Sequence, residues 1–206
     1  AFRRKSISFF NGLTDEDSIV YWFQSRSFTI DLRLKHRSGT PAHERQGWIG
    51  NTLWDAEQAL LSWQVADTAN YQNHVQWTEP AKLHAIGNGI LEFSPSNVYV
   101  EDWRQQVHSG LYLGLRLKTA VDVECGEQLN MDGGLIICDR HVAYTLTRLP
   151  EIQNLVSLLD LTADGLETHT IEQIESFEVS IGTDGHTKSY STSSGQSDQP
   201  FNFDAF

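Results

Sequence analysis

The chain has 206 residues, of which 39% are hydrophobic, so it holds enough apolar material for a packed core and is not a disordered chain. Its 15 basic and 27 acidic residues give a formal net charge of −12, which disfavours nucleic acid and anionic lipid surfaces as partners. No apolar run approaches the roughly 18 residues that a membrane span requires.

Alternation of apolar and polar residues dominates the first half of the chain. Phe28, Ile30, Leu32 and Leu34 are separated by single polar residues, and this period of two predicts a strand with one dry and one wet face. The same patterning predicts further strands at residues 3–10, 18–25, 47–54, 57–65, 82–87, 89–94 and 98–105. One short helical segment is expected at residues 68–77.

The second half repeats this mixture of strands with one helix. Strands are predicted at residues 111–118, 134–139, 141–148, 172–182 and 187–192. A helix is predicted to begin at Pro150-Glu151, because Ile152, Leu155, Val156 and Leu159 follow at helical spacing.

Similar residues recur in the same order in the two halves. The tetrapeptide Leu-Arg-Leu-Lys occurs at residues 32–35 and again at 115–118, an offset of 83 positions. Trp22 and Trp103 precede the two copies at an offset of 81. Matches in one order at a nearly constant offset indicate an internal duplication.

The sequence therefore predicts an all-β protein made of two similar antiparallel barrel or sandwich halves, each with one short helix. The halves are expected at residues 1–96 and 97–206. One larger closed barrel built from both halves is the alternative architecture.

Several segments together resemble a little-characterised family of duplicated, lipocalin-like β-barrel proteins. They are Arg3-Arg4-Lys5-Ser6, Trp22, Asp31-Leu32-Arg33-Leu34 and Tyr99-Val100-Glu101-Asp102-Trp103. The resemblance implies two related β-barrel halves and no established catalytic residues. It names no specific ligand.

Six side chains are candidates for contacting a ligand. In the first half they are Trp22, Trp54, Trp63 and Arg33, and in the second half Trp103 and Arg116 are their counterparts. The tryptophans either pack as core or line an aromatic pocket for a small apolar molecule. Each arginine lies between leucines. It either points outward or, if the lumen is wet, points inward as a hook for an anionic head group.

No catalytic or metal-binding pattern is present at recognisable spacing. Glu101 and Asp102 are neighbours on one strand and must face opposite sides, so the acidic residues are interpreted as a solvated surface. The eight histidines include no metal-ligand pair, and neither a metal nor a cofactor is expected. Cys125 and Cys138 are interpreted as free thiols of a cytoplasmic protein, with a single disulfide as the alternative.

Three classes of function stay open. The first is a non-enzymatic binding protein that holds a small hydrophobic or amphipathic ligand in a barrel. The second is a protein-interaction or scaffold module that presents its acidic surface or a sheet edge to a protein partner. The third is an enzyme of unknown class, which would need convergent polar groups inside a cavity.

Overall fold

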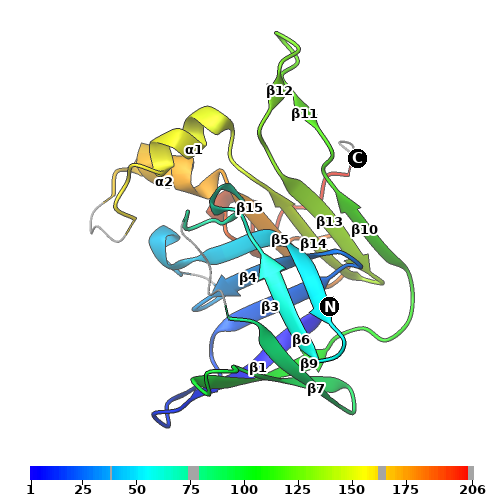
Figure 1. The fold of residues 1–206 in the computed structure, drawn as a ribbon. Helices are drawn as coiled ribbons and strands as arrows, with labels where there is room; N and C mark the ends of the chain where they lie inside the picture. The colour runs from blue at the N-terminus through cyan, green and yellow to red at the C-terminus, as the bar shows by residue number, and fades with distance from the viewer. Residues whose placement is uncertain (38, 74–78, 162–165, 204–206) are drawn as a thin grey trace.

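The computed structural model describes residues 1–37, 39–73, 79–161 and 166–203. It combines a closed barrel with a second, open sheet that packs on the outside of the barrel wall (Figure 1). Eight antiparallel strands form the barrel, and pairing of the first with the last closes it. They are β1 (Phe2–Phe9), β3 (Ile19–Gln24), β4 (Phe28–Leu34), β5 (Gln46–Asp55), β6 (Leu60–Gln64), β7 (Ala81–Ile86), β8 (Gly89–Phe93) and β9 (Tyr99–Gln105).

Short elements complete the barrel. The two-residue strand β2 (Thr14–Asp15) pairs with the end of β1. Single 3₁₀ turns follow β4 and β6, η1 (Ala42–Glu44) and η2 (Asp67–Ala69).

The open sheet has five antiparallel strands in the order β10-β13-β14-β15-β16. These are β10 (Tyr112–Arg116), β13 (Gly133–Cys138), β14 (His141–Leu146), β15 (Glu178–Gly182) and β16 (Tyr190–Ser191). A hairpin of β11 (Ala120–Val121) and β12 (Gln128–Leu129) projects away from the rest of the molecule (Figure 1). Helices α1 (Pro150–Val156) and α2 (Thr168–Glu175) connect β14 to β15, and η3 (Ser194–Gln196) follows β16.

The main core lies between the barrel wall and the open sheet. Ile30, Leu32 and Leu34 of β4 are almost fully buried there, so the predicted dry face of this strand is confirmed. Ile136 of β13 and Ile181 of β15 belong to the same core. The dry face of β4 is therefore the outer face of the barrel, and its polar residues are left to face the lumen.

A buried arginine ties the helices to the barrel. Arg148 donates hydrogen bonds of 2.7 Å to the backbone carbonyls of Tyr71 and Ile174, and its guanidinium lies over the rings of Tyr71 and Phe177. Burial lowers the pKa of Arg148 to about 10. The Ile174 carbonyl belongs to the last turn of α2, where the helix dipole is negative. The positive charge of Arg148 therefore stabilises this end of the helix.

The predicted β-rich fold with a closed antiparallel barrel is confirmed, but the two halves of the chain do not share one architecture. Residues 2–105 close into a barrel, whereas the second half is an open sheet with a different strand order. The structure therefore does not show an internal duplication. β9, which was expected to begin the second half, pairs with β8 and β1 instead, because without it the barrel would keep two unpaired edges. The alternative of one barrel built from both halves is not formed either.

The helix predicted at Pro150 is confirmed as α1, although it ends at Val156. The strand predicted over residues 172–182 is wrong in its first part, which belongs to α2, and right in β15. Ile171 and Ile174, three residues apart, are the helical signal there. Of the helical segment predicted at 68–77, η2 covers the beginning, and residues 74–78 lie outside the described part.

Both cysteines are free thiols, Cys125 exposed and Cys138 buried, as the first of the two interpretations predicted. Among the described residues, no helix combines the length and the apolar character that crossing a bilayer requires.

Candidate functional site

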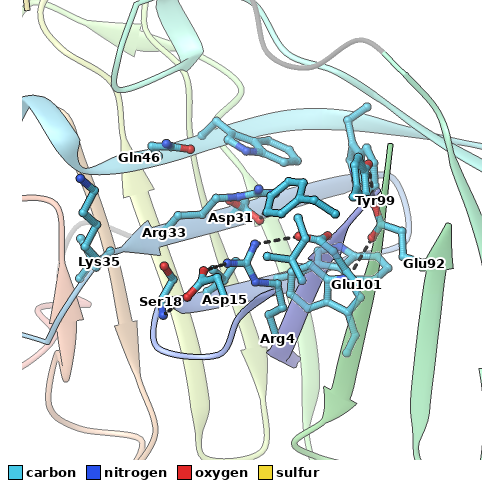
Figure 2. Close-up of a pocket in the computed structure, with 18 of the residues that line it drawn as sticks. Arg4, Asp15, Ser18, Asp31, Arg33, Lys35, Gln46, Glu92, Tyr99 and Glu101 are labelled. Atoms are coloured by element: carbon cyan, nitrogen blue, oxygen red, sulfur yellow. Dashed lines mark hydrogen bonds and ion pairs between the residues drawn. The ribbon is translucent and has the colours of Figure 1, made fainter. Parts of the chain in front are cut away.

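A cavity of about 420 Å³ lies inside the barrel. Every barrel strand except β7 contributes a side chain to its wall. Side chains fill the interior of some eight-stranded barrels, whereas this barrel keeps an unfilled cavity. Figure 2 shows Arg4, Arg33 and Glu101 pointing into this common space from three different strands.

Four tryptophans form the aromatic core of the apolar wall, which also includes Phe9 and several aliphatic side chains. Trp22 lies edge-to-face against Trp63 and Trp103, with ring centroids 6.0 and 5.6 Å apart. Trp48 packs in the same way on Trp63, at 6.1 Å. Such edge-to-face pairs hold large rings in fixed positions, so this part of the wall is preformed.

The indole nitrogens of these tryptophans differ in their partners. Trp22 donates to Gln24 Oε1 and Trp63 to Thr29 Oγ1, each at 3.1 Å, while Trp103 donates to Glu92 Oε2 at 2.9 Å. The Nε1 atom of Trp48 is buried and has no hydrogen-bond partner in the described part of the chain. A buried donor without an acceptor costs free energy, so this nitrogen is a candidate contact for a bound molecule.

Arg4 reaches the cavity because of a β-bulge in β1. The register with β9 shifts between Arg4 and Ser6, so Arg4 and Ile7 both line the cavity although three positions separate them. The guanidinium of Arg4 bridges Glu101 and Asp15, with both N–O distances 2.8 Å. Although burial opposes ionisation, backbone hydrogen bonds near Ser18 and the charge of Arg4 lower the pKa of Asp15.

Asp31 and Arg33 face the lumen from β4, two residues apart. Asp31 is paired across the sheet with Trp22 on β3 and Trp48 on β5, so a carboxylate lies between two of the aromatic rings. The Nε atom of Arg33 donates to Asp31 Oδ1 at 2.8 Å. Burial opposes the charge of Arg33, but the carboxylates of Asp31, Glu101 and Glu92 outweigh it and raise the pKa of the guanidinium.

Glu92 and Glu101 are directly opposed on β8 and β9, and each is only 3% exposed. Glu92 accepts hydrogen bonds from Trp103 Nε1 at 2.9 Å and from the Tyr99 hydroxyl at 3.3 Å. Burial and the neighbouring Glu101 carboxylate raise the pKa of Glu92 to about 8. Glu92 therefore gains or loses a proton near neutral pH, which is unusual for a carboxyl group.

Negative charge predominates in the cavity wall. Three basic residues, Arg4, Arg33 and Lys35, stand against six acidic ones: Asp15, Asp31, Glu44, Glu79, Glu92 and Glu101. Within the described residues, no group of three or more His, Cys, Asp or Glu side chains is arranged to hold a metal ion. The arrangement offers ion pairing, proton exchange and aromatic contact to a bound molecule.

Four of the six predicted site residues meet in this cavity: Trp22, Arg33, Trp63 and Trp103. Arg33 follows the wet-lumen alternative and points inward. Trp103 was expected in a second barrel. It lies in the first barrel because its strand, β9, closes that barrel by pairing with β1.

The other two predicted residues lie outside the cavity. Trp54 shares a face of the sheet with Leu61 but lies beside the β5–β6 turn and is 53% exposed. Arg116 lies on the open sheet, where it pairs with Asp132 and rests over the ring of Phe28. The predicted grouping of Trp22, Trp54 and Trp63 is therefore wrong for Trp54.

Sequence reasoning missed Trp48, Arg4, Glu92 and Glu101. The interpretation of the acidic residues as a solvated surface is wrong for Glu92 and Glu101, which are buried in the barrel. The alternation Tyr99, Glu101, Trp103 contained a signal, because it places the carboxylate on the same face as two aromatic residues. Arg4 had no such signal, because only the bulge turns it inward.

Comparisons of the chain with protein-family models, with curated proteins and with solved structures returned no match. The site is therefore interpreted from its own geometry.

Proposed function

We propose that this protein binds one small amphipathic molecule inside the barrel. The observation that carries the proposal is the unfilled cavity of about 420 Å³, which falls within the range of small-molecule sites. Its wall joins a preformed surface of tryptophan rings to buried charged groups. This combination supports a ligand with an apolar body and one polar end.

The exposure of the lining residues supports an entry route. Lys35 and Asp15 are partly exposed, whereas Trp22 and Trp103 are buried. A molecule entering beside Lys35 would meet charged side chains first and the tryptophans at the far end. Ligand binding would then need no opening of the closed strand ladder.

A fluorescence titration with 1-aminoanthracene, a neutral apolar dye, tests the proposal. We expect saturable binding of one dye per chain, with energy transfer from the cavity tryptophans. Trp63→Ala removes a ring from the cavity wall and should weaken dye binding. Trp54→Ala also removes an indole ring, but from an exposed position at the end of β5. This variant should bind the dye as the wild type does.

A second variant guards against a Trp63→Ala protein that fails to fold. Gln46→Trp adds a ring to the half-buried position that pairs across the sheet with Arg33. It should fill part of the cavity and weaken dye binding while the far-ultraviolet circular dichroism stays unchanged. The absence of saturable binding to the wild type would overturn the proposal, as would equal losses in Trp63→Ala and Trp54→Ala.

A second candidate function is association with a protein through the edge of the open sheet. β10 is an edge strand, and Leu111, Tyr112, Leu113 and Leu115 on or beside it are exposed. Exposed apolar edge strands pair readily with strands of other chains. Sedimentation over a range of concentrations should then show self-association that Leu113→Lys removes, and a wild type that stays monomeric throughout would count against it.

A further inference from the structure

We propose that the molecule bound in the barrel is an organic cation, a protonated amine whose ammonium group lies beside Glu92 and Glu101 and whose apolar body packs on the tryptophans. This inference rests on the proposed function and adds the chemical class of the ligand. Four features of the cavity carry it.

The first feature is the commitment of the basic residues. Arg4 is held by Glu101 and Asp15, and Arg33 is held by Asp31. Lys35 pairs with Glu44. Within the described residues Glu92 forms no ion pair, and it accepts its hydrogen bonds from Trp103 and Tyr99, which are neutral groups. The cavity thus holds a buried carboxyl group that lacks a cation of its own.

The second feature is the set of groups that face Glu92. From β9 these are Tyr99 and Glu101, and from β4 Arg33. Asp31 of β4 and Arg4 of β1 line the same cavity. From β7 the residue opposite Glu92 is the apolar Leu83. An added ammonium group would meet the opposed carboxyl groups of Glu92 and Glu101 and would relieve the repulsion between them. An added anion would increase that repulsion.

The third feature is the aromatic wall. Cations bind favourably over tryptophan faces, and the attraction grows when water is excluded. Trp22, Trp48, Trp63 and Trp103 line the same cavity as the carboxyl groups. A protonated amine with an apolar body is the class of ligand that uses both surfaces at once.

The fourth feature is Trp48. Its buried Nε1 atom lacks an acceptor in the described part of the chain, and the side chain is 5% exposed and lines the cavity. A hydrogen-bond acceptor on the bound molecule would satisfy it. This observation is independent of the charge balance and indicates an occupant with a polar atom at that point.

Three indole probes of matched shape test the inference: tryptamine as the cation, tryptophol as the neutral compound and indole-3-acetate as the anion. Each is measured by displacement of 1-aminoanthracene and by calorimetry at pH 8. We expect tryptamine to bind at least about tenfold more tightly than tryptophol, as one buried ion pair allows. Indole-3-acetate should bind more weakly than tryptophol.

The pH dependence of the wild type gives a second measurement that needs no variant. Tryptamine affinity should rise between pH 6 and pH 8 as Glu92 loses its proton, by roughly tenfold per pH unit at the limit. The amine itself stays protonated over this range. Tryptophol affinity should stay constant, and calorimetry in two buffers should detect protons released when tryptamine binds.

Matched variants assign the effect to Glu92. Glu92→Gln should remove most of the preference for tryptamine over tryptophol, and its far-ultraviolet circular dichroism spectrum checks that it folds as the wild type does. Asp102→Asn removes one negative charge from the opposite face of β9, next to Glu101 in the sequence, and should keep the preference.

The outcomes separate the two proposals. If 1-aminoanthracene binds but tryptamine binds no better than tryptophol, the cation assignment is overturned and the binding function stands. A preference that survives in Glu92→Gln also overturns the assignment. If neither the dye nor any indole binds, the proposed function itself is overturned.

Discussion

The two copies of Leu-Arg-Leu-Lys, in β4 and at the end of β10, lie in opposite surroundings. In the first copy Leu32 is fully buried in the core and Arg33 faces the cavity. In the second copy Leu115 is 40% exposed, and Arg116 turns toward the outer wall of the barrel, over the ring of Phe28. The same four residues thus place leucines inward in one sheet and outward in the other.

Alternation of apolar and polar residues defines the two faces of a strand, but it does not decide what covers each face. β4 is covered on one side by the open sheet, which buries its leucines, and on the other side by the barrel lumen. β10 is an edge strand whose leucines have no layer over them. The environment of each copy comes from strands far away in the sequence.

The largest difference between the copies is expected for the leucines. Leu32→Ala leaves a hole in a packed core and should lower the free energy of unfolding by about 2–5 kcal/mol. Leu115→Ala removes an exposed side chain and should lower it by less than about 1 kcal/mol. Urea denaturation of both variants measures the contrast, and equal losses would contradict the assignment of the two environments.

The arginines should differ by a smaller amount. Arg33→Met removes a cation that faces Asp31, Glu101 and Glu92, and it should lower the free energy of unfolding by about 1–3 kcal/mol. The loss should be larger at pH 8 than at pH 5, because the raised pKa of Glu92 keeps this carboxyl group protonated at pH 5, where it does not need the cation. Arg116→Met, which breaks a partly exposed pair with Asp132, should cost about 0–1 kcal/mol. Denaturation at the two pH values tests both variants.

The carboxyl group of Glu92 should make the cavity sensitive to pH. Its pKa is raised in the folded state, so the folded chain binds more protons than the unfolded chain between about pH 4.5 and pH 8. Stability from this group is therefore present below pH 4.5 and lost as the pH rises through 8.

Glu92→Gln should match the wild type near pH 5 and exceed its free energy of unfolding by about 1–3 kcal/mol at pH 9. Thermal or urea unfolding between pH 5 and pH 9 measures the free energy of unfolding of both proteins. The contributions of the other titrating groups cancel in the difference between them. A difference that does not change with pH would contradict the assigned protonation of Glu92.

The lysines should show the smallest effects. Lys35 forms an exposed pair with Glu44, and Lys118 is exposed on the open-sheet side. Pairs of this kind are screened by water and salt. Lys35→Ala and Lys118→Ala should both have the free energy of unfolding of the wild type within measurement error in urea denaturation. A clear loss of stability in only one of them would contradict the expectation that both lysines contribute little.

Much of the barrel was predictable because its strands alternate strictly. All eight barrel strands overlap predicted ones. Four predicted site residues line the cavity: Trp22, Arg33, Trp63 and Trp103. Arg4, Trp48, Glu92 and Glu101 were not named, because their approach depends on a bulge and on cross-strand neighbours. Trp54 lies outside the cavity although its parity matches that of Trp48, because its strand runs on to an exposed turn.

Local sequence patterns are enough to predict a β-rich fold, the position of most strands and the helix that begins at Pro150. These features follow from local periodicity and from the backbone limits of proline, which act over a few residues. Long-range packing closes the barrel with β9, opens the second half into a sheet and lines one cavity with six acidic and three basic side chains. Strand pairing joins residues as far apart as Phe2 and Gln105, and the core joins Ile30 to Ile181. No local pattern records which partner a strand will find.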